Sequence, residues 1–269
     1  MEKYALLDTD FISKTHTVRI DDNNHLIDRI LEMPEYVFFC HEQTVVELSR
    51  HNSYAPEWLK KKIEEKIILC YTDEQIIDEL VSLLSSAGLY KYTQMLKIAC
   101  DAFDRNYFAV HYNELMRINY TEISRDEYLN KLMYLDTCVV EGNNLGEIKE
   151  YILLQVLNLF YGDKVYVFCS DDHSARNGIL NIDEVQIQCI TLLSSFFQLR
   201  KESCYSVADA EPYIKAALEF YHGHKQTLVR VVESTEVKRM QRITCEQALY
   251  DIFADKFIKL KNGLLKYKE

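Results

Sequence analysis

The chain has 269 residues and a formal net charge of −11, and 48% of its residues are hydrophobic against 27% that are charged. This balance is ordinary for a globular protein with a substantial core, and it excludes a chain that is disordered throughout. Only 7 glycines and 3 prolines occur, which excludes collagen-like and proline-rich architectures and predicts short loops and much helix.

In the first half of the chain, two short apolar runs predict buried strands over residues 4–7 and 36–40. Apolar residues at helical spacing follow each run. The predicted helices cover residues from 11 to about 31, 41–50, several segments within 58–119, and 127–135.

In the second half, a helix is predicted over residues 147–161, and Gly162 marks its end. Further elements alternate in type: a strand over 164–169, a turn and short helix within 170–180, a strand over 185–191 and a helix over 192–200. Strands separated by helices, with no Asn-Gly hairpin among them, predict an α/β fold with a central parallel sheet covered on both faces.

The C-terminal segment, residues 203–269, changes in pattern and in charge. We predict a helix over 210–221, a strand over 227–232, a helix over 245–257 and a final strand over 258–267, which together form a small α+β appendage. Residues 225–269 hold ten basic and six acidic residues, a net charge of +4 that leaves −15 on the rest of the chain. We expect this basic tail to face the functional site and bind a polyanionic substrate.

Cysteine usage and the N-terminus bear on the compartment. No Cys-x-x-Cys pair occurs among the 8 cysteines, and several of them lie within apolar runs, as expected of reduced, buried side chains. No apolar stretch reaches the roughly 18 to 20 residues of a membrane span, and the N-terminal residues do not resemble a signal peptide. We therefore expect a cytoplasmic protein.

Acidic residues lie where the predicted strands end, or at the start of the helices nearby. Asp8 and Asp10 follow the first strand, Asp171 and Asp172 follow the strand over 164–169, and Glu47 and Glu147 lie on helices. Ligands of open parallel sheets bind beyond the carboxyl ends of the strands, so we expect these acids to converge there. Carboxylates that meet without intervening lysines bind cations or protonate, and such oxygen ligands suit Mg²⁺ or Mn²⁺.

A structural explanation exists for each acid alone. Asp10, Glu147 and Asp172 stand at predicted helix starts, where acidic residues are favoured. Because all six acids share one type of location, we favour the metal site over a set of helix caps.

The motifs around these acids resemble those of PIN-domain nucleases. The matching stretches are LLDTDFIS at Leu6–Ser13, TVVELSR at Thr44–Arg50, LGEIKEYILL at Leu145–Leu154, FCSDDHSAR at Phe168–Arg176 and QCITLLSSFF at Gln188–Phe197. Gly-Glu in the third motif and Asp-Asp-x-x-Ala-Arg in the fourth are typical of one variant of that family. The resemblance implies a three-layer α/β/α PIN-like domain over residues 1–202, with a helical insertion over about 55–143.

The resemblance also implies hydrolysis of RNA by a site that holds Mg²⁺ or Mn²⁺. Asp8, Glu47, Glu147 and Asp171 would be the catalytic acids and metal ligands, and Asp10 and Asp172 would be further ligands. Ser170 and Arg176 would contact the substrate. We expect the RNA to be single-stranded. A toxin or a defence component is the biological setting that we consider, although the resemblance does not settle it. A protein partner such as an antitoxin, or a second copy of the chain, would be consistent with that setting.

Two alternatives stay open. Asp8-Thr9-Asp10 and Asp171-Asp172 also resemble the acids of haloacid-dehalogenase-like phosphatases, in which Asp8 would be a nucleophile. That reading leaves Glu47 and Glu147 unused, and no convincing lysine motif supports it. The second alternative is a non-catalytic binding module that keeps a relict site.

Overall fold

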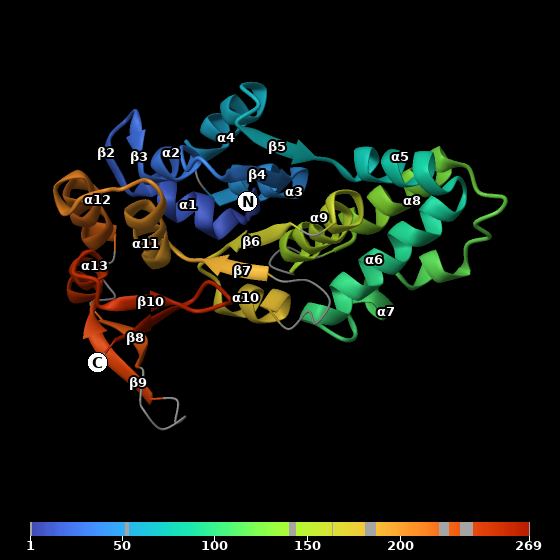
Figure 1. Cartoon of the computed structure of the whole chain (residues 1–269). Coiled ribbons are helices and arrows are strands. Elements are labelled where there is room, and N and C mark those ends of the chain that lie inside the picture. Colours follow the sequence, from blue (N-terminus) through green and yellow to red (C-terminus); the bar gives the residue numbers. More distant parts are fainter. Residues whose placement is uncertain are drawn as a thin grey trace. The chain divides into compact units, whose positions relative to one another are not determined.

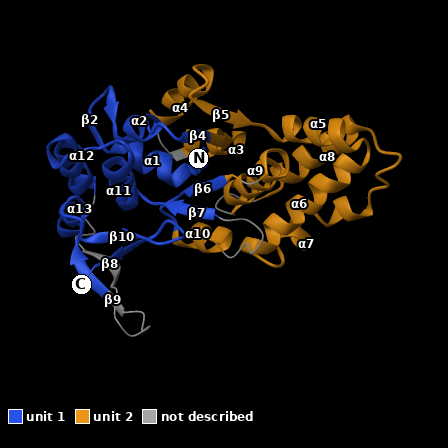
Figure 2. Ribbon diagram, in the orientation of Figure 1, with its two compact units in different colours: residues 1–38, 165–172, 186–269 blue, residues 39–164, 173–185 orange. Residues whose placement is uncertain are grey.

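The computed structural model describes residues 2–51, 54–139, 144–162, 164–180, 187–220, 226–231 and 239–268 (Figure 1). The chain divides into two compact units (Figure 2). The first unit comprises Met1–Phe38, Val165–Asp172 and Gln186–Glu269, and the second comprises Phe39–Lys164 and His173–Val185. The C-terminal segment thus groups with the N-terminal residues, so this division does not follow the boundary predicted near residue 203.

Among the described residues, five strands form one sheet in the order β5-β4-β1-β6-β7. These strands are β1 (Lys3–Leu7), β4 (Tyr36–His41), β5 (Ile68–Tyr71), β6 (Val165–Cys169) and β7 (Ile187–Ile190). β1 pairs with β6, and β6 with β7, in parallel register. Four of the five residues of β1 are buried, as expected of a strand with both faces covered. The predicted α/β fold with a parallel sheet flanked by helices is confirmed.

The first unit also holds helices. They are α1 (Thr9–Thr17), α2 (Leu26–Leu31), α11 (Leu192–Glu202), α12 (Val207–Phe220) and α13 (Cys245–Phe253), and a short hairpin of β2 (Arg19–Asp21) and β3 (Asn24–His25) separates the first two. The helical stretch expected from residue 11 to about 31 is therefore wrong where β2 and β3 interrupt it. Threonine hydroxyls set two of the starts: Thr191 accepts from the Ser194 N–H at 3.1 Å, and Thr244 accepts from the Gln247 N–H at 3.0 Å.

A four-stranded sheet forms the end of the chain and corrects three predictions. Its strands are β8 (Gln226–Val231), β9 (Arg239–Thr244), β10 (Phe257–Lys259) and β11 (Leu265–Tyr267), in the order β10-β11-β8-β9. The single strand expected over 258–267 is wrong, because it is an antiparallel hairpin. The helix expected over 245–257 ends at Phe253, and β9 was not predicted.

Gly263 explains the turn of that hairpin. Its φ is +82°, a conformation that residues with a side chain rarely adopt. A Cβ atom there would lie 2.4 Å from the Cys189 carbonyl oxygen, so only glycine lets the hairpin lie this close to β7.

The second unit is mainly helical. Its helices are α3 (Glu42–His51), α4 (Ala55–Glu64), α5 (Asp73–Leu84), α6 (Ala87–Phe103), α7 (Tyr107–His111), η1 (Asn113–Arg117), α8 (Arg125–Thr137), α9 (Leu145–Tyr161) and α10 (His173–Leu180). The prediction of helices alone over 58–119 is wrong at Ile68–Tyr71, which is β5. A short apolar run does not show by periodicity whether it is strand or helix. Gly162 ends α9 with a φ of +62°, as predicted.

Each helix in the described part of the chain is too short or too polar to span a membrane.

Two buried histidines connect α1 with the β2–β3 hairpin. The rings of His16 and His25 stack at 3.9 Å between centroids, and His25 Nδ1 lies 2.5 Å from the His16 carbonyl oxygen. Burial, followed by the neighbouring His25 charge, lowers the pKa of His16 to about 4. His16 is therefore neutral in the folded protein at pH values where the unfolded chain protonates it.

This arrangement makes the stability of the first unit depend on pH. The folded-state pKa of His16 lies below the unfolded value of about 6.5. The contribution of neutral His16 to the free energy of unfolding is therefore present above pH 6.5 and is lost as the pH falls towards 4. The loss in the free energy of unfolding amounts to at most about 3 kcal/mol. In urea unfolding at pH 7.5 and 4.5, the free energy of unfolding should change less with pH in His16→Phe than in the parent protein. An equal change in both proteins would contradict this account.

Candidate functional site

In the first unit, the predicted site residues gather where three adjacent parallel strands end. Asp8 follows β1, and its N–H donates to the Cys169 carbonyl at 3.1 Å. Ser170 follows β6, and its N–H donates to the Ile190 carbonyl, at the end of β7, at 3.0 Å. These hydrogen bonds continue the sheet and fix Asp8 and Ser170 on neighbouring strand ends, as the sequence predicts.

The Asp8 carboxylate is buried, with 5% of the residue exposed. Asp8 occupies the N-cap position of α1, yet its side chain makes no capping hydrogen bond. It accepts instead from the Ser170 hydroxyl at 2.7 Å. Helix capping, the structural alternative for such acids, therefore does not explain this carboxylate.

Ser170 orients Asp8. Its Oγ donates to Asp8 Oδ2 and accepts from the Asp172 N–H at 3.1 Å. Since a serine hydroxyl has one proton, this proton is committed to the Asp8 carboxylate. The structure thus gives Ser170 a positioning contact in addition to the predicted contact with substrate, which stays a prediction.

Asp171 makes a structural hydrogen bond and also lies close to Lys14, which contacts Asp10. Its Oδ1 accepts from the Leu192 N–H at 2.8 Å, at the first turn of α11. Its Oδ2 lies 3.6 Å from Lys14 Nζ. Asp172 is exposed and follows in the chain. A helix N-terminus favours a nearby negative charge, so the first turn of α11 is a favourable place for the Asp171 carboxylate.

Lys14 corrects the expectation that no lysine lies among these acids. It stands one turn beyond Asp10 on α1, and its Nζ lies 2.7 Å from Asp10 Oδ2. Burial alone would lower the pKa of Lys14, but the hydrogen bond to Asp10 and the charge of Asp171 outweigh it and raise this pKa above its ordinary value. Lys14 is therefore a cation that partly neutralises the acids.

In the second unit, Glu47 lies against the start of α9. A Cβ atom on Gly146 would lie 2.5 Å from Glu47 Oε2, so the absence of a side chain at Gly146 makes room for this carboxylate. Gln43 Nε2 donates to Glu47 Oε1 at 3.2 Å. Glu147 follows Gly146 in the first turn of α9. The Gly-Glu pair singled out in the sequence thus brings Glu47 to the helix turn that carries Glu147.

The six acids are therefore distributed over both units. Asp8, Asp10, Asp171 and Asp172 belong to the first unit, and Glu47 and Glu147 belong to the second. Arg176 lies on α10 in the second unit and is half-buried. That all these residues serve one set of metals and one substrate stays a prediction.

Sequence reasoning missed a buried charge network in the second unit. Lys149, 1% exposed, donates from Nζ to Asp73 Oδ2 at 2.6 Å and to Asp136 Oδ2 at 2.8 Å. The Tyr92 hydroxyl donates to Asp73, and the Tyr112 hydroxyl donates to Asp136 at 2.5 Å. The three charged residues are far apart in the chain and follow no motif, so only the fold brings them together.

The pKa values in this network shift as opposite charges require. Burial alone would raise the pKa of Asp73, but the Lys149 ammonium outweighs it and holds this pKa well below its usual range. Burial would lower the pKa of Lys149, and the charges of Asp136 and Asp73 raise it well above its ordinary value. Asp73 and Lys149 are therefore both charged in the folded protein at neutral pH.

His41, Glu42 and Asp73 offer ligand atoms within 4.8 Å of one another, which suggests a second place for a metal. The Gln43 N–H, however, donates to His41 Nδ1 at 3.2 Å, so the ring proton lies on Nε2, which faces Asp73 Oδ1 at 3.3 Å. A protonated nitrogen has no lone pair for a metal, and Lys149 already neutralises Asp73. We therefore interpret this group as part of the ion network.

Glu150 connects this network with the predicted site residues of the second unit. Its buried Oε1 accepts from the His41 N–H at 2.9 Å and from the Thr44 hydroxyl at 2.8 Å. The contacts tie α9, which carries Glu147, to the β4–α3 junction and so to the helix that carries Glu47. Lys149 and Glu150 therefore hold in place the two elements that carry these acids.

The basic tail is less uniform than its charge count suggests. Lys256 pairs with Asp251 at 2.9 Å, and burial lowers the pKa of Lys259. Arg242, Lys261 and Lys268 are exposed. Lys225 and Lys238 lie outside the described residues, as do the side chains of Arg230 and Arg239. Binding of a polyanion by this tail stays a prediction.

Comparisons of the chain with protein-family models, with curated proteins and with solved structures found no match. The resemblance to PIN-domain nucleases therefore rests on the order of the motifs and on their residues. The first and fourth motifs lie at the ends of two adjacent strands, and the family itself stays a prediction.

The Lys149 network yields a test of stability. Lys149→Met would leave the buried Asp73 and the half-buried Asp136 without the Lys149 cation, so we expect the free energy of unfolding to fall by about 3–5 kcal/mol. Lys131→Met is the matched control, because Lys131 forms an exposed ion pair with Glu114 at 2.8 Å and should lose no more than about 1 kcal/mol. Urea unfolding measures both, and similar losses in the two variants would contradict this account.

Proposed function

We propose that this protein is a divalent-metal-dependent ribonuclease that uses Mg²⁺ or Mn²⁺. The observation that carries the proposal is the Asp8 carboxylate. It is buried at a strand end, is withheld from helix capping, and is fixed by Ser170 beside the strand end that bears Asp171. Burial of a carboxylate is unfavourable. Acids at the ends of two neighbouring strands, Asp8 and Asp171, therefore support a chemical role for this edge of the sheet.

The acids of the first unit are of the residue type that a hard divalent cation prefers. Asp8, Asp10, Asp171 and Asp172 supply carboxylate oxygens, the ligands that Mg²⁺ and Mn²⁺ prefer. With Lys14, these five residues carry a formal charge of −3, so a cation would still be attracted. Glu47 and Glu147 enter the proposal as further ligands through the motif resemblance.

When bound, the metal supplies a water of lowered pKa and neutralises charge on the phosphate. The residues of the chain have separate tasks in the proposal. Asp8 and Asp171 hold the cation, Ser170 keeps the Asp8 carboxylate in one orientation, and the backbone at Leu192 does the same for Asp171. No protein side chain needs to act as a nucleophile.

Lys14 gives specific support to a second reaction, the hydrolysis of a phosphomonoester. Such a phosphatase uses an aspartate as nucleophile. An Asp8 oxygen would attack phosphorus as the alcohol leaves, and water would then release phosphate from the aspartyl phosphate. A lysine in contact with Asp10 and near Asp171 could balance the charge of the phosphate. We rank the ribonuclease first because the phosphatase gives no task to Glu47 and Glu147.

A cleavage assay tests the proposal. Labelled single-stranded RNA, single-stranded DNA and p-nitrophenyl phosphate are incubated with the full chain in Mn²⁺, Mg²⁺ or EDTA. We expect cleavage of RNA that EDTA abolishes and that Asp8→Asn and Asp171→Asn each reduce at least about 100-fold. Asparagine keeps an oxygen for the hydrogen bonds from Ser170 and Leu192, so both variants should fold.

The control is Asp22→Asn, which removes an exposed acid of the same unit that pairs with Arg19, and it should cleave as the parent does. RNA cleavage that resists EDTA and both site variants would overturn the proposal. Turnover of p-nitrophenyl phosphate without strand cleavage would establish the phosphatase instead. No turnover of any substrate would favour the non-catalytic module.

Binding of the metal gives an independent prediction about Lys14. The Lys14 ammonium and a divalent cation compete for the same carboxylates, so Lys14→Gln should bind Mn²⁺ about fivefold more tightly. Calorimetric titration with Mn²⁺ measures this, and Lys215→Gln, which removes an exposed partner of Glu211, should leave the affinity unchanged. If Lys14→Gln leaves the affinity for Mn²⁺ unchanged or weakens it, Lys14 does not compete with the metal for the carboxylates.

A further inference from the structure

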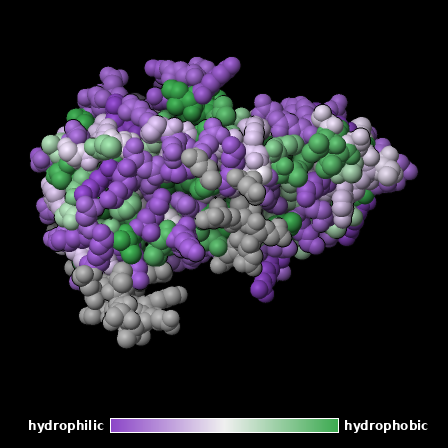
Figure 3. Space-filling view, in the orientation of Figure 1, coloured by the Kyte–Doolittle hydropathy of each residue, from purple (hydrophilic) through white to green (hydrophobic). Residues whose placement is uncertain are grey.

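A pocket in the second unit lies along β5, the strand at one end of the sheet order. Its volume is about 440 Å³, and its lining is mainly apolar with a few polar side chains. The lining residues are Ile63, Lys66, Ile68, Leu69, Cys70, Tyr71, Gln75 and Glu79. In the space-filling view, hydrophobic surface is visible at α4 and β5 (Figure 3), where Ile67 and Leu69 are exposed.

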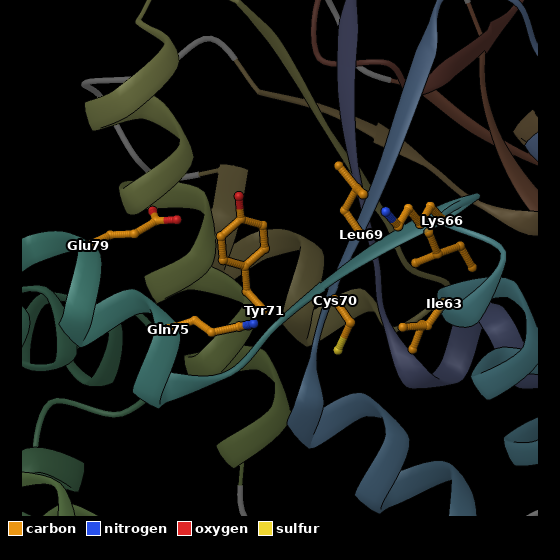
Figure 4. Close-up of a pocket in the computed structure, with 8 residues that line it drawn as sticks. Ile63, Lys66, Leu69, Cys70, Tyr71, Gln75 and Glu79 are labelled. Carbon is orange, nitrogen blue, oxygen red and sulfur yellow. The ribbon is translucent and has the colours of Figure 1, made fainter.

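Cys70 points to one side of β5 within this pocket. Figure 4 shows its sulfur on the same side of the strand as Ile63, whereas Leu69 and Tyr71 point to the other side. Cys70 is half-buried and is one of the residues that line the pocket.

A second thiol lies beside Cys70. β4 and β5 are hydrogen-bonded neighbours in the sheet, and Cys40 on β4 forms a hydrogen bond with Cys70 on β5. Cys40 is completely buried, and both residues are free cysteines. The sheet therefore holds an accessible thiol and a buried thiol in direct contact.

The contact makes the two thiols unequal. The hydrogen bond from Cys40 lowers the pKa of the Cys70 thiol, in spite of its partial burial. The same bond, together with burial, raises the pKa of the Cys40 thiol well above its ordinary value. The place of Cys70 in the lining of the pocket, together with this direction of its pKa, favours Cys70 over the buried Cys40 as the thiol that reacts first.

We propose that Cys70 and Cys40 form a dithiol that reacts with hydroperoxides, with Cys70 as the attacking thiol and Cys40 as the resolving thiol. An accessible cysteine next to a resolving cysteine is the usual arrangement of a redox-sensitive pair. The site does not involve the proposed nuclease residues, so it stands or falls independently of the ribonuclease.

The reaction balances in two steps. The Cys70 thiolate attacks one oxygen of the peroxide and breaks the O–O bond, which gives a sulfenic acid and, after uptake of a proton, water or an alcohol. The Cys40 sulfur then attacks the Cys70 sulfur, and the sulfenic hydroxyl leaves as a second water with the Cys40 proton. Each thiol gives up one electron, and the peroxide takes up both.

Two exposed cysteines of the same chain, Cys138 and Cys204, provide an internal comparison. The full chain is treated with a small excess of hydrogen peroxide, alkylated with N-ethylmaleimide at intervals, digested and mapped by mass spectrometry. We expect a Cys40–Cys70 disulfide to appear, with the Cys70 thiol lost about tenfold faster than those of Cys138 and Cys204.

Two variants assign the roles. In Cys40→Ser the disulfide should be absent, and Cys70 should accumulate as a sulfenic acid that dimedone traps. In Cys70→Ser, which changes a pocket-lining position and should fold, Cys40 should remain a thiol throughout. If Cys40→Ser does not fold, the parent and Cys70→Ser decide the question. Retention of both thiols while Cys138 and Cys204 oxidise, or oxidation of Cys40 in Cys70→Ser at the parent rate, would overturn the proposal.

Discussion

Burial of ionised carboxylates is the constraint on which both units depend. A buried carboxylate is destabilising by several kcal/mol unless hydrogen-bond donors or a cation compensate it. In the first unit, the Ser170 hydroxyl compensates Asp8. In the second unit, Lys149 compensates Asp73 and Asp136, and Glu150 accepts from the His41 backbone and from Thr44. These hydrogen bonds and ion pairs connect separate segments of the chain. They therefore specify tertiary contacts that apolar packing alone would not determine.

The kind of compensation separates structural acids from candidate functional ones. Asp73 and Asp136 face an ammonium that is itself buried and that donates to both. Asp8 accepts a hydrogen bond from a neutral hydroxyl, which fixes the orientation of its carboxylate. Lys14 is intermediate, since it is half-exposed and contacts Asp10 more closely than Asp171. The burial of Asp8 outside helix capping, next to the strand end that carries Asp171, is our physical reason for placing the chemistry at the strand ends of the first unit.

The second unit holds two features besides its strand of the sheet: the ion network around α9 and the Cys40–Cys70 pair. Its ion network holds α9 and the β4–α3 junction together, and these elements bear Glu147 and Glu47. Its β5 lies next to β4 in the sheet and brings Cys70 to Cys40. Because β4 leads directly into α3, oxidation of the proposed dithiol would alter the strand that precedes the helix of Glu47. The stretch that the motif resemblance treats as an insertion thus contributes a strand of the sheet.

The sequence by itself determined the α/β class, the strand ends that carry Asp8 and Asp171, and the glycine that ends α9. These features depend on local apolar patterning and on backbone conformation, which a short window of residues encodes. Only the tertiary structure decided that Ile68–Tyr71 is a strand, that residues 257–267 form a hairpin, and that Lys14 lies among the acids. The Lys149 network and the Cys40–Cys70 contact also depend on pairs far apart in sequence. No local pattern specifies such pairs, because their free energy exists only once the fold has removed them from water and brought them into contact.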